Sequence, residues 1–273
     1  MKKIVLIPTY NEKENISAIL KAVLSYETGY HILVIDDGSP DGTANIVRSL
    51  MLEYPERLFL ECRSGKLGLG TAYIHGFKWA LAKGYDYIIE MDADFSHNPI
   101  DLDRLGAACD AGADVAIGSR YVEGGATDNW PLDRRIYSKG GSAYTRIITG
   151  MPVMDPTAGF VCYKSKVLAA INFDNIKFIG YAFQIEMKFA AWKLGFKIKE
   201  VPILFIDRTI GASKMSKGII KEAIFGVLSM QWESFTGQFK QKIKKDGSNA
   251  VVNESFDTNS VFVTPTIGFI WEF

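Results

Sequence analysis

The first two thirds of the chain alternate short apolar runs with longer segments of helical periodicity. The apolar runs have the length of buried strands and cover residues 4–7, 32–35, 57–62, 85–91 and 114–117. The segments between them repeat apolar side chains at helical spacing, over residues 15–26, 43–54, 71–82 and the stretch after Pro99. Strands that alternate with helices predict an α/β fold with a mostly parallel sheet flanked by helices. Because such sheets bind ligands at the carboxyl ends of their strands, polar motifs at those ends are the candidates for chemistry.

Beyond Gly118 the alternation is looser. We expect further elements in the order helix, strand entered from a turn, helix, strand, over residues 134–149, 155–163, 182–194 and 197–205. Residues 216–235 predict a strongly apolar, amphipathic C-terminal helix. One domain over residues 1–235 accounts for all these elements. Residues 236–273 form a tail, polar and lysine-containing at first and apolar at its end, to which the sequence assigns no role.

The composition limits the class of protein. The 31 Lys and Arg residues balance 31 Asp and Glu residues, and a formal net charge of zero disfavours a nucleic-acid binder. The three cysteines are widely spaced and fit neither a zinc site nor a disulfide framework, which favours a reducing compartment. No signal peptide precedes the first strand, and no apolar stretch has the length of a membrane span. We therefore expect a protein that is soluble or rests on a membrane surface.

Polar motifs follow the first two predicted strands. The first strand runs into residues 8–12, Pro-Thr-Tyr-Asn-Glu, which offer a flat ring and polar groups at the strand end. In the second motif, Asp36 and Asp37 directly follow a buried strand, where two carboxylates need a partner such as the N–H and O–H groups of a base or ribose. The alternative for both motifs is a turn with a helix cap, since Asn, Asp, Ser, Gly and Pro all favour turns.

A glycine-rich turn over residues 65–71 precedes a predicted helix. Backbone N–H groups in such a turn can approach a phosphate, and Lys66 adds a positive charge. The spacing differs from that of a P-loop, which places its lysine after the last glycine. Lys66 is a candidate for contact with a phosphate group.

The fourth predicted strand ends in residues 90–97, Glu-Met-Asp-Ala-Asp-Phe-Ser-His. In extended chain Asp92 and Asp94 point the same way, and two close carboxylates repel unless a proton or a cation lies between them. Carboxylates and substrate phosphates are the usual ligands of Mg²⁺ or Mn²⁺, so the sequence predicts a divalent metal site here. The alternative is a turn in which Ser96 or Asn98 caps the next helix. His97 is expected to be a turn residue, because the three histidines form no cluster.

Two arginines and a serine form the next candidate group. Arg134 and Ser138 are four residues apart and hence neighbours on one face of a predicted helix, while Arg120 follows the fifth strand. An arginine beside a hydroxyl group can hold a phosphate. A surface salt bridge is the alternative for any one of these arginines.

Residues 208–217 combine cations with glycine and small residues, among them Arg208, Ser213 and Lys214. This composition predicts a mobile loop that can close over an anionic ligand. The loop leads into the helix of residues 216–235, whose apolar side chains and flanking lysines suit a membrane interface. The alternative is a helix packed on the domain.

Taken together, these segments resemble glycosyltransferase family 2, whose catalytic domain has the GT-A fold, and within it the polyprenyl- and dolichyl-phosphate mannose synthases. The resemblance covers residues 2–230. It rests on seven segments in order, residues 8–12, 36–43, 92–94, 118–121, 130–138, 155–160 and 208–214.

The resemblance implies a role for individual residues. The nucleoside would be held by Pro8, Tyr10, Glu12, Ile35, Asp37 and Asp92. The metal would be held by Asp92 and Asp94, with Ser96 standing where some members have a glutamine ligand. The acceptor or product phosphate would be bound by Arg120, Arg134 and Ser138, which together with Asp94 form the expected catalytic set. The acceptor loop would carry Arg208, Ser213 and Lys214.

The implied activity is an inverting, metal-dependent transfer of a hexose to a polyprenyl or dolichyl monophosphate. The favoured donor is GDP-mannose, and the favoured location is peripheral, at the cytoplasmic face of a membrane. One alternative is a family 2 enzyme that uses UDP-glucose or another nucleotide sugar, or another acceptor. Two others are a nucleotide-binding module without turnover and a nucleotidyltransferase, which would release diphosphate.

Overall fold

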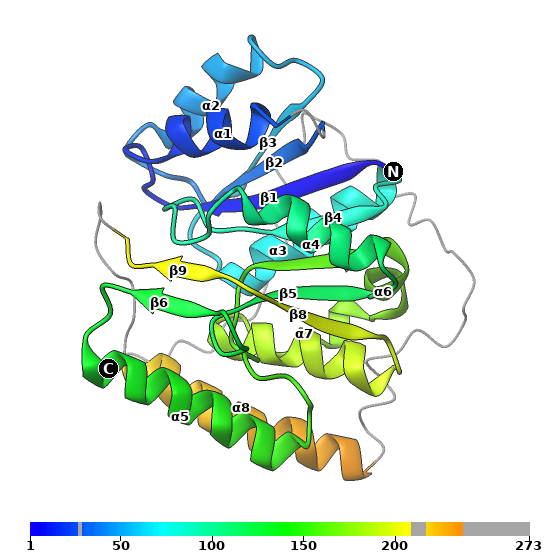
Figure 1. Ribbon diagram of the computed structural model, residues 1–273. Helices are drawn as coiled ribbons and strands as arrows, with labels where there is room; N and C mark the ends of the chain where they lie inside the picture. The colour runs from blue at the N-terminus through cyan, green and yellow to red at the C-terminus, as the bar shows by residue number, and fades with distance from the viewer. Residues whose placement is uncertain (27–28, 209–216, 237–273) are drawn as a thin grey trace.

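The computed structural model describes residues 1–26, 29–208 and 217–236, and Figure 1 shows their arrangement. Seven strands form one sheet in the order β3-β2-β1-β4-β7-β5-β8. Strand β7 runs antiparallel to its neighbours β4 and β5, and the other four pairs are parallel. The prediction of a mostly parallel sheet is therefore confirmed. The strands are β1 (Lys3–Thr9), β2 (His31–Asp36), β3 (Leu58–Cys62), β4 (Tyr87–Glu90), β5 (Val115–Ser119), β7 (Val161–Lys164) and β8 (Ile198–Pro202).

Each face of the sheet has its own hydrophobic core, and β1 contributes to both. Ile4 and Leu6 belong to one core, whereas Val5 and Ile7 belong to the other. Side chains alternate across a strand, so a sheet covered by helices on both faces is built from continuous apolar runs. The first core contains residues of α3 (Leu69–Ala82), α6 (Ser165–Ala170) and α7 (Tyr181–Lys193). The second contains residues of α1 (Ile16–Leu24), α2 (Thr43–Met51) and α4 (Asp101–Asp110).

The single strand expected over residues 197–205 is wrong, because the structure divides this segment between two sheets. Strand β8 ends at Pro202, which has no N–H to donate to a continuing ladder. The carbonyl of Ile203 then accepts a hydrogen bond from the N–H of Ala126, at 3.0 Å. The chain continues into a separate two-stranded parallel sheet. Its strands are β6 (Ala126–Asp128) and β9 (Leu204–Ile206).

Helices α5 (Leu132–Thr149) and α8 (Lys217–Thr236) lie side by side at one end of the molecule (Figure 1). The hydroxyl of Tyr144 on α5 donates to the carbonyl of Ile224 on α8, at 3.0 Å. Helix α8 buries Val227 and Met230. It also exposes aromatic side chains, so it packs on the domain with one face and presents an apolar second face.

Several short elements were not expected from the sequence, because periodicity cannot be recognised over so few residues. They are α6, β6 and a 3₁₀ helix, η1 (Phe173–Asn175). Over the ranges that the structure describes, no helix combines the length and the apolarity that crossing a bilayer requires. The predicted tail lies outside those ranges, apart from Thr236 at the end of α8.

Candidate active site

The predicted polar motifs gather at one edge of the sheet. Strand β1 pairs in parallel with β2 and β4, and β5 points the same way as β4 because both are antiparallel to β7. The segments that leave these strands begin at or near Tyr10, Asp37, Asp92 and Arg120. They therefore emerge at the same edge, which is the ligand-binding edge of a parallel sheet.

The two adjacent carboxylates after β2 have different partners. The buried Asp36 accepts hydrogen bonds from the hydroxyl groups of Thr9, at 2.9 Å, and Ser39, at 2.6 Å, so it fixes the turn. Asp37 accepts a hydrogen bond from Nε of Arg63, at 2.6 Å. The predicted nucleoside contact Asp37 thus comes with a cation that the sequence analysis missed. Arg63 directly follows β3, and that position at a strand end was the available signal.

The glycine-rich turn closes against the same place. The backbone N–H of Leu67 donates to the carboxylate of Asp37, at 3.2 Å. The ammonium group of Lys66 lies 5.2 Å from the centre of the Tyr10 ring. An aromatic ring, a carboxylate and a cation therefore meet where the sequence predicted a nucleotide.

The other nucleoside candidates lie nearby but differ in what they can offer. Pro8 and Ile35 are opposite each other in the β1–β2 ladder, and the Ile35 side chain is fully buried in the core. Any contact of Ile35 with a nucleoside would therefore use its backbone. The backbone N–H of Glu12 donates to the Thr43 hydroxyl, at 3.0 Å, and its carboxylate accepts from the Asn15 amide, at 3.2 Å.

The segment after β4, residues 91–97, is called the acidic tip here and holds a buried carboxylate with a cation beside it. The Asp94 side chain is 5% exposed, whereas that of Asp92 is 39% exposed. One oxygen of Asp94 accepts from the Ser96 hydroxyl, at 2.6 Å, and the other lies 2.5 Å from Nη2 of Arg208. Burial alone would raise the pKa of the Asp94 carboxyl, but the hydrogen bonds from Ser96 and the charge of Arg208 hold it below its ordinary value.

His97 closes this tip. Its buried ring accepts the backbone N–H of Asp92 at Nδ1, with a separation of 3.1 Å. Burial lowers the pKa of His97 to about 4, although the nearby Asp94 opposes the shift. The ring is therefore neutral at pH 7 and carries its hydrogen on Nε2. His97 lies in the bend that follows β4.

A divalent ion at Asp92 and Asp94 stays a prediction, which the chemistry of the two carboxylates supports. Among the described residues, no group of three or more His, Cys, Asp or Glu side chains comes together to hold a metal. Asp94 binds the guanidinium group of Arg208, so this carboxylate already interacts with a cation. Hard carboxylate oxygens suit Mg²⁺ or Mn²⁺, which take their remaining ligands from water and substrate phosphates. Ser96 donates its hydroxyl to Asp94 and is 2% exposed, so it would have to break that bond to face an ion.

Arg120 forms a buried ion pair with Asp155. Its Nε and Nη2 atoms donate to the two carboxylate oxygens of Asp155, at 2.7 and 2.6 Å, and Nη2 also donates to the Thr157 hydroxyl, at 2.8 Å. Burial would raise the pKa of Asp155, but the charge and hydrogen bonds of Arg120 lower it below its ordinary value. The role of Arg120 at an acceptor phosphate stays a prediction, since its fork holds a carboxylate here.

Arg134 and Ser138 on α5 face the same small region, in agreement with their spacing. The Arg134 guanidinium lies 4.2 Å from the Trp130 ring centre, and its Nη1 donates to Asp207, at 2.5 Å. The Ser138 hydroxyl accepts from the hydroxyl of Tyr121, at 2.6 Å. The Tyr121 and Trp130 rings lie 5.1 and 5.4 Å from the Arg120 guanidinium, so both side chains border the surroundings of Arg120.

Two adjacent residues after β9 join the two halves of the site. Asp207 pairs with Arg134 on the predicted acceptor side, and Arg208 pairs with Asp94 on the predicted metal side. The spacing of the sequence gave no indication of either pairing. The other two residues predicted for this loop lie outside the described residues; they are Ser213 and Lys214.

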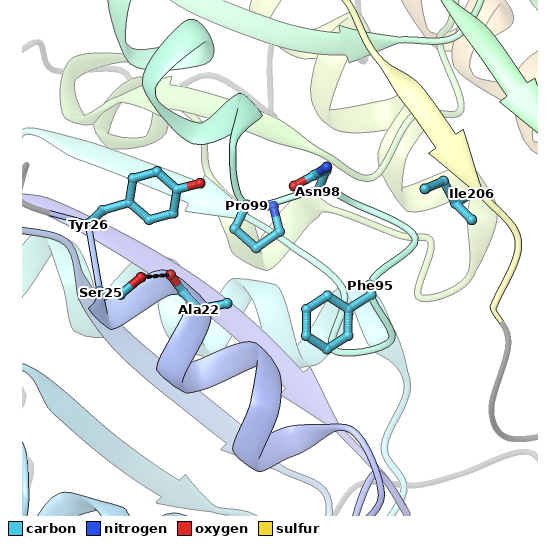
Figure 2. Close-up of a pocket in the computed structure, with 7 residues that line it drawn as sticks. All are labelled: Ala22, Ser25, Tyr26, Phe95, Asn98, Pro99 and Ile206. Carbon is cyan, nitrogen blue, oxygen red and sulfur yellow. Dashed lines mark hydrogen bonds between the residues drawn. The ribbon is translucent and has the colours of Figure 1, made fainter.

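An open pocket of about 340 Å³ lies beside the tip, between α1 and the end of β9 (Figure 2). It is lined by Ala22, Ser25, Tyr26, Phe95, Asn98, Pro99 and Ile206. None of these residues is a predicted site residue, and the lining carries no carboxylate, lysine or arginine. We therefore define the candidate site by the charged groups at the strand ends and not by this pocket.

The sequence pattern described as "Glycosyl transferase family 2" matches residues 4–171, a range that includes the motifs after β1, β2, β4 and β5. The chain belongs to this family. It is therefore a glycosyltransferase.

Two named relatives are similar over most of their length. A polyprenol monophosphomannose synthase of Mycolicibacterium smegmatis is 47% identical over 226 residues, which cover 83% of this chain and 85% of the relative. An undecaprenyl-phosphate mannosyltransferase of Micrococcus luteus is 45% identical over 237 residues, which cover 85% and 97%.

Solved structures of lower identity share the fold of this glycosyltransferase. Mannosyl-3-phosphoglycerate synthase of Rubrobacter xylanophilus has a TM-score of 0.64 at 15% identity and covers 90% of this chain and 78% of its own. Glucosyl-3-phosphoglycerate synthase of Mycobacterium tuberculosis, in complex with Mn²⁺, UDP-glucose and glycerol 3-phosphate, has a TM-score of 0.58 at 15% identity, with 86% and 80% covered. The GT-A arrangement of sheet and helices is thereby confirmed.

Proposed function

We propose that this glycosyltransferase transfers mannose from GDP-mannose to a polyprenyl phosphate, with inversion at the anomeric carbon and a divalent ion at Asp92 and Asp94. One observation carries the proposal: an acidic segment and a basic group lie close to each other. The adjacent residues Asp207 and Arg208 connect them, because Asp207 pairs with Arg134 and Arg208 pairs with Asp94. The acidic tip suits the metal and diphosphate of a donor, and the arginine suits an anionic acceptor. The names of both relatives, which specify mannose transfer and a prenol phosphate, support this choice of substrates.

The proposed reaction needs little help from a general base. A phosphate monoester loses its second proton with a pKa of about 6, so an acceptor oxygen is already ionised at neutral pH. That oxygen forms a bond to the anomeric carbon while the bond to the donor phosphate oxygen breaks, and GDP leaves with the electron pair. The ion, when bound, neutralises the departing diphosphate. Arg134 would orient the acceptor phosphate, while Tyr10 and Asp37 would hold the nucleoside.

The exposed face of α5 and α8 supports a position at a membrane surface, which we place on the cytoplasmic side. The large apolar side chains exposed on the two helices are Leu132, Ile136, Tyr137 and Ile147 on α5, and Ile224, Phe225, Leu228, Trp232 and Phe235 on α8. Arg135 and Lys139 are exposed on the same α5 helix that carries Arg134 and Ser138. Apolar bulk with basic neighbours suits an anionic lipid interface, and a lipid acceptor would approach from that side.

A detergent assay with labelled GDP-mannose, labelled UDP-glucose and a short polyprenyl phosphate tests this function. We expect a mannosyl lipid together with GDP. Formation of a glucosyl lipid together with UDP would show that the donor is UDP-glucose. Release of diphosphate would indicate nucleotidyl transfer instead. The absence of any glycolipid from either donor would overturn the proposal.

The metal role has a separate test in Asp94→Ala. We expect transfer to be abolished while the circular dichroism spectrum stays that of the folded protein, because the Asp94 carboxylate would hold the ion that neutralises the diphosphate. Normal turnover of this variant, with magnesium and manganese chelated, would exclude the site.

A further inference from the structure

His97 lies between the two halves of the candidate site and contacts both. Nδ1 of its ring accepts a hydrogen bond from the backbone N–H of Asp92, in the tip that also carries Asp94. The ring itself packs against two phenylalanines, Phe160 and Phe205. No other role was assigned to this side chain above, although it is 2% exposed and polar.

The first contact fixes the shape of the acidic tip. The chain leaves β4, turns at Phe95 with a φ of +61°, and returns so that Nδ1 of His97 lies 3.1 Å from the Asp92 nitrogen. The turn thus joins the start and the end of the tip through a side chain. The hydrogen bond is part-buried, so removal of Nδ1 would leave the Asp92 N–H without its acceptor and would favour another arrangement of the two carboxylates.

The second contact reaches the acceptor side. The His97 ring stacks on Phe160, with centroids 4.9 Å apart and an angle of 13° between the planes. Its edge meets Phe205 of β9, with centroids 5.5 Å apart. Phe205 in turn contacts the Trp130 ring at 5.3 Å, and the Trp130 ring lies under the Arg134 guanidinium. A continuous row of rings therefore runs from the tip to the predicted phosphate site.

We propose that His97 is a positioning residue that sets the two carboxylates of the tip through Nδ1 and the acceptor side through its ring. The inference rests on the proposed function, because it assumes a metal at Asp92 and Asp94. His97 touches neither donor nor acceptor in this account. It acts through Asp92 on one side and through Phe205 on the other.

A matched pair of substitutions separates the two contacts. In His97→Asn the side-chain oxygen can take the place of Nδ1, whereas in His97→Gln it lies near the position of Nε2. We expect His97→Asn to keep its Mn²⁺ affinity within about threefold and His97→Gln to lose about tenfold, as is usual for groups that orient metal ligands. Both variants lose the ring, so both should show a raised KM for polyprenyl phosphate.

The contact between His97 and Phe205 is tested separately with Phe205→Leu. It leaves the contact of His97 with Asp92 in place, so we expect a raised KM for the lipid phosphate and an unchanged Mn²⁺ affinity. His75→Gln, a change to a partly exposed histidine that pairs with Glu61, is the control and should change neither quantity. Mn²⁺ binding is followed by electron paramagnetic resonance without substrate, and folding by thermal unfolding.

Equal Mn²⁺ affinities for His97→Asn and His97→Gln would overturn the inference, whether both are normal or both are weak. A normal KM for the acceptor in Phe205→Leu would also overturn it. Failure of the proposed function is recognised separately: in that case Asp94→Ala would bind Mn²⁺ as tightly as the unaltered protein.

Discussion

The guanidinium of Arg208 lies 2.5 Å from Oδ2 of Asp94, at the carboxylate where the divalent ion is proposed to bind. The Asp94 side chain is 5% exposed and that of Arg208 is 24% exposed, so the pair is largely shielded from water. Burial would raise the pKa of the Asp94 carboxyl, and the hydrogen bond from Ser96 together with this charge keeps it below its ordinary value. The protein thus supplies a positive charge of its own at the proposed metal position.

Removal of this charge should strengthen metal binding in the absence of donor. An ion that binds Asp94 must displace Arg208, and a hydrogen bond between charged groups contributes about 1.5–3 kcal/mol. At about 1.4 kcal/mol per tenfold, we expect Arg208→Gln to bind Mn²⁺ roughly 10- to 100-fold more tightly without nucleotide, as measured by calorimetry. Arg135→Gln removes an exposed arginine of α5 and serves as the control for net charge. An unchanged or weaker affinity in Arg208→Gln would show that the two cations do not compete.

The Arg120–Asp155 pair should make stability depend on pH in the acid range. The pKa of Asp155 is lower in the folded protein than in the unfolded chain, so at acid pH the folded state binds fewer protons and protonation favours unfolding. The stabilisation is complete above the unfolded pKa of about 4 and is lost as the pH falls through the folded pKa. We expect Asp155→Asn to lower the free energy of unfolding by about 3–5 kcal/mol at pH 7, because it leaves the Arg120 charge without its partner.

Urea unfolding from pH 7 to pH 3 measures this effect. The difference between Asp155→Asn and the unaltered protein should narrow below about pH 4, as the natural carboxyl becomes protonated. Asp174→Asn, at an 81% exposed side chain, is the matched control and should follow the unaltered protein. A difference that stays constant down to pH 3 would contradict the ionic origin of the stabilisation.

The fold could be predicted from the sequence where burial leaves a recognisable run or spacing of apolar residues. Strands such as β1 are covered on both faces, so every residue from Ile4 to Ile7 is apolar and the run is recognisable. The antiparallel β7 between β4 and β5 was not predictable, because strand order and direction depend on contacts between distant segments. The end of β8 at Pro202 had a local signal in the proline itself. Apolar residues on both sides of Pro202 made the segment look like one strand, so the separation of β8 from β9 was not predicted.

The candidate site was predictable as a set of strand ends but not as a set of partners. Asp37, Asp92 and Asp94 follow strands directly, and the fold brings them to one edge. Their neighbours Arg63 and Arg208 come from segments 26 and 114 residues further along the chain, and no spacing rule links such positions. Ion pairs of this kind depend on the tertiary structure alone.

Loss of the Arg134 side chain should mainly impair use of the acceptor. Removal of one electrostatic donor from a catalytic site costs about 2.7–4 kcal/mol, or roughly 100- to 1000-fold in rate. We expect Arg134→Ala to lower kcat/KM for polyprenyl phosphate by about 100-fold and to change the Kd for GDP-mannose less than about threefold. Arg48→Ala, at an exposed position in the last turn of α2, is the control. Equal effects on donor and acceptor would argue against a phosphate site at Arg134.

The apolar face of α5 and α8 should attach the protein to anionic vesicles. Phe225 and Trp232 are 69% and 68% exposed, and burial of one large apolar side chain contributes about 1.5–3 kcal/mol. We expect the double variant Phe225→Ser, Trp232→Ser to lower vesicle affinity more than tenfold in a sedimentation assay, while soluble nucleotide binding stays normal. Leu52→Ser is the control, since Leu52 is 85% exposed next to α2, at the opposite end of the molecule (Figure 1). If Leu52→Ser weakens sedimentation as much as the double variant does, the attachment is not made by this face.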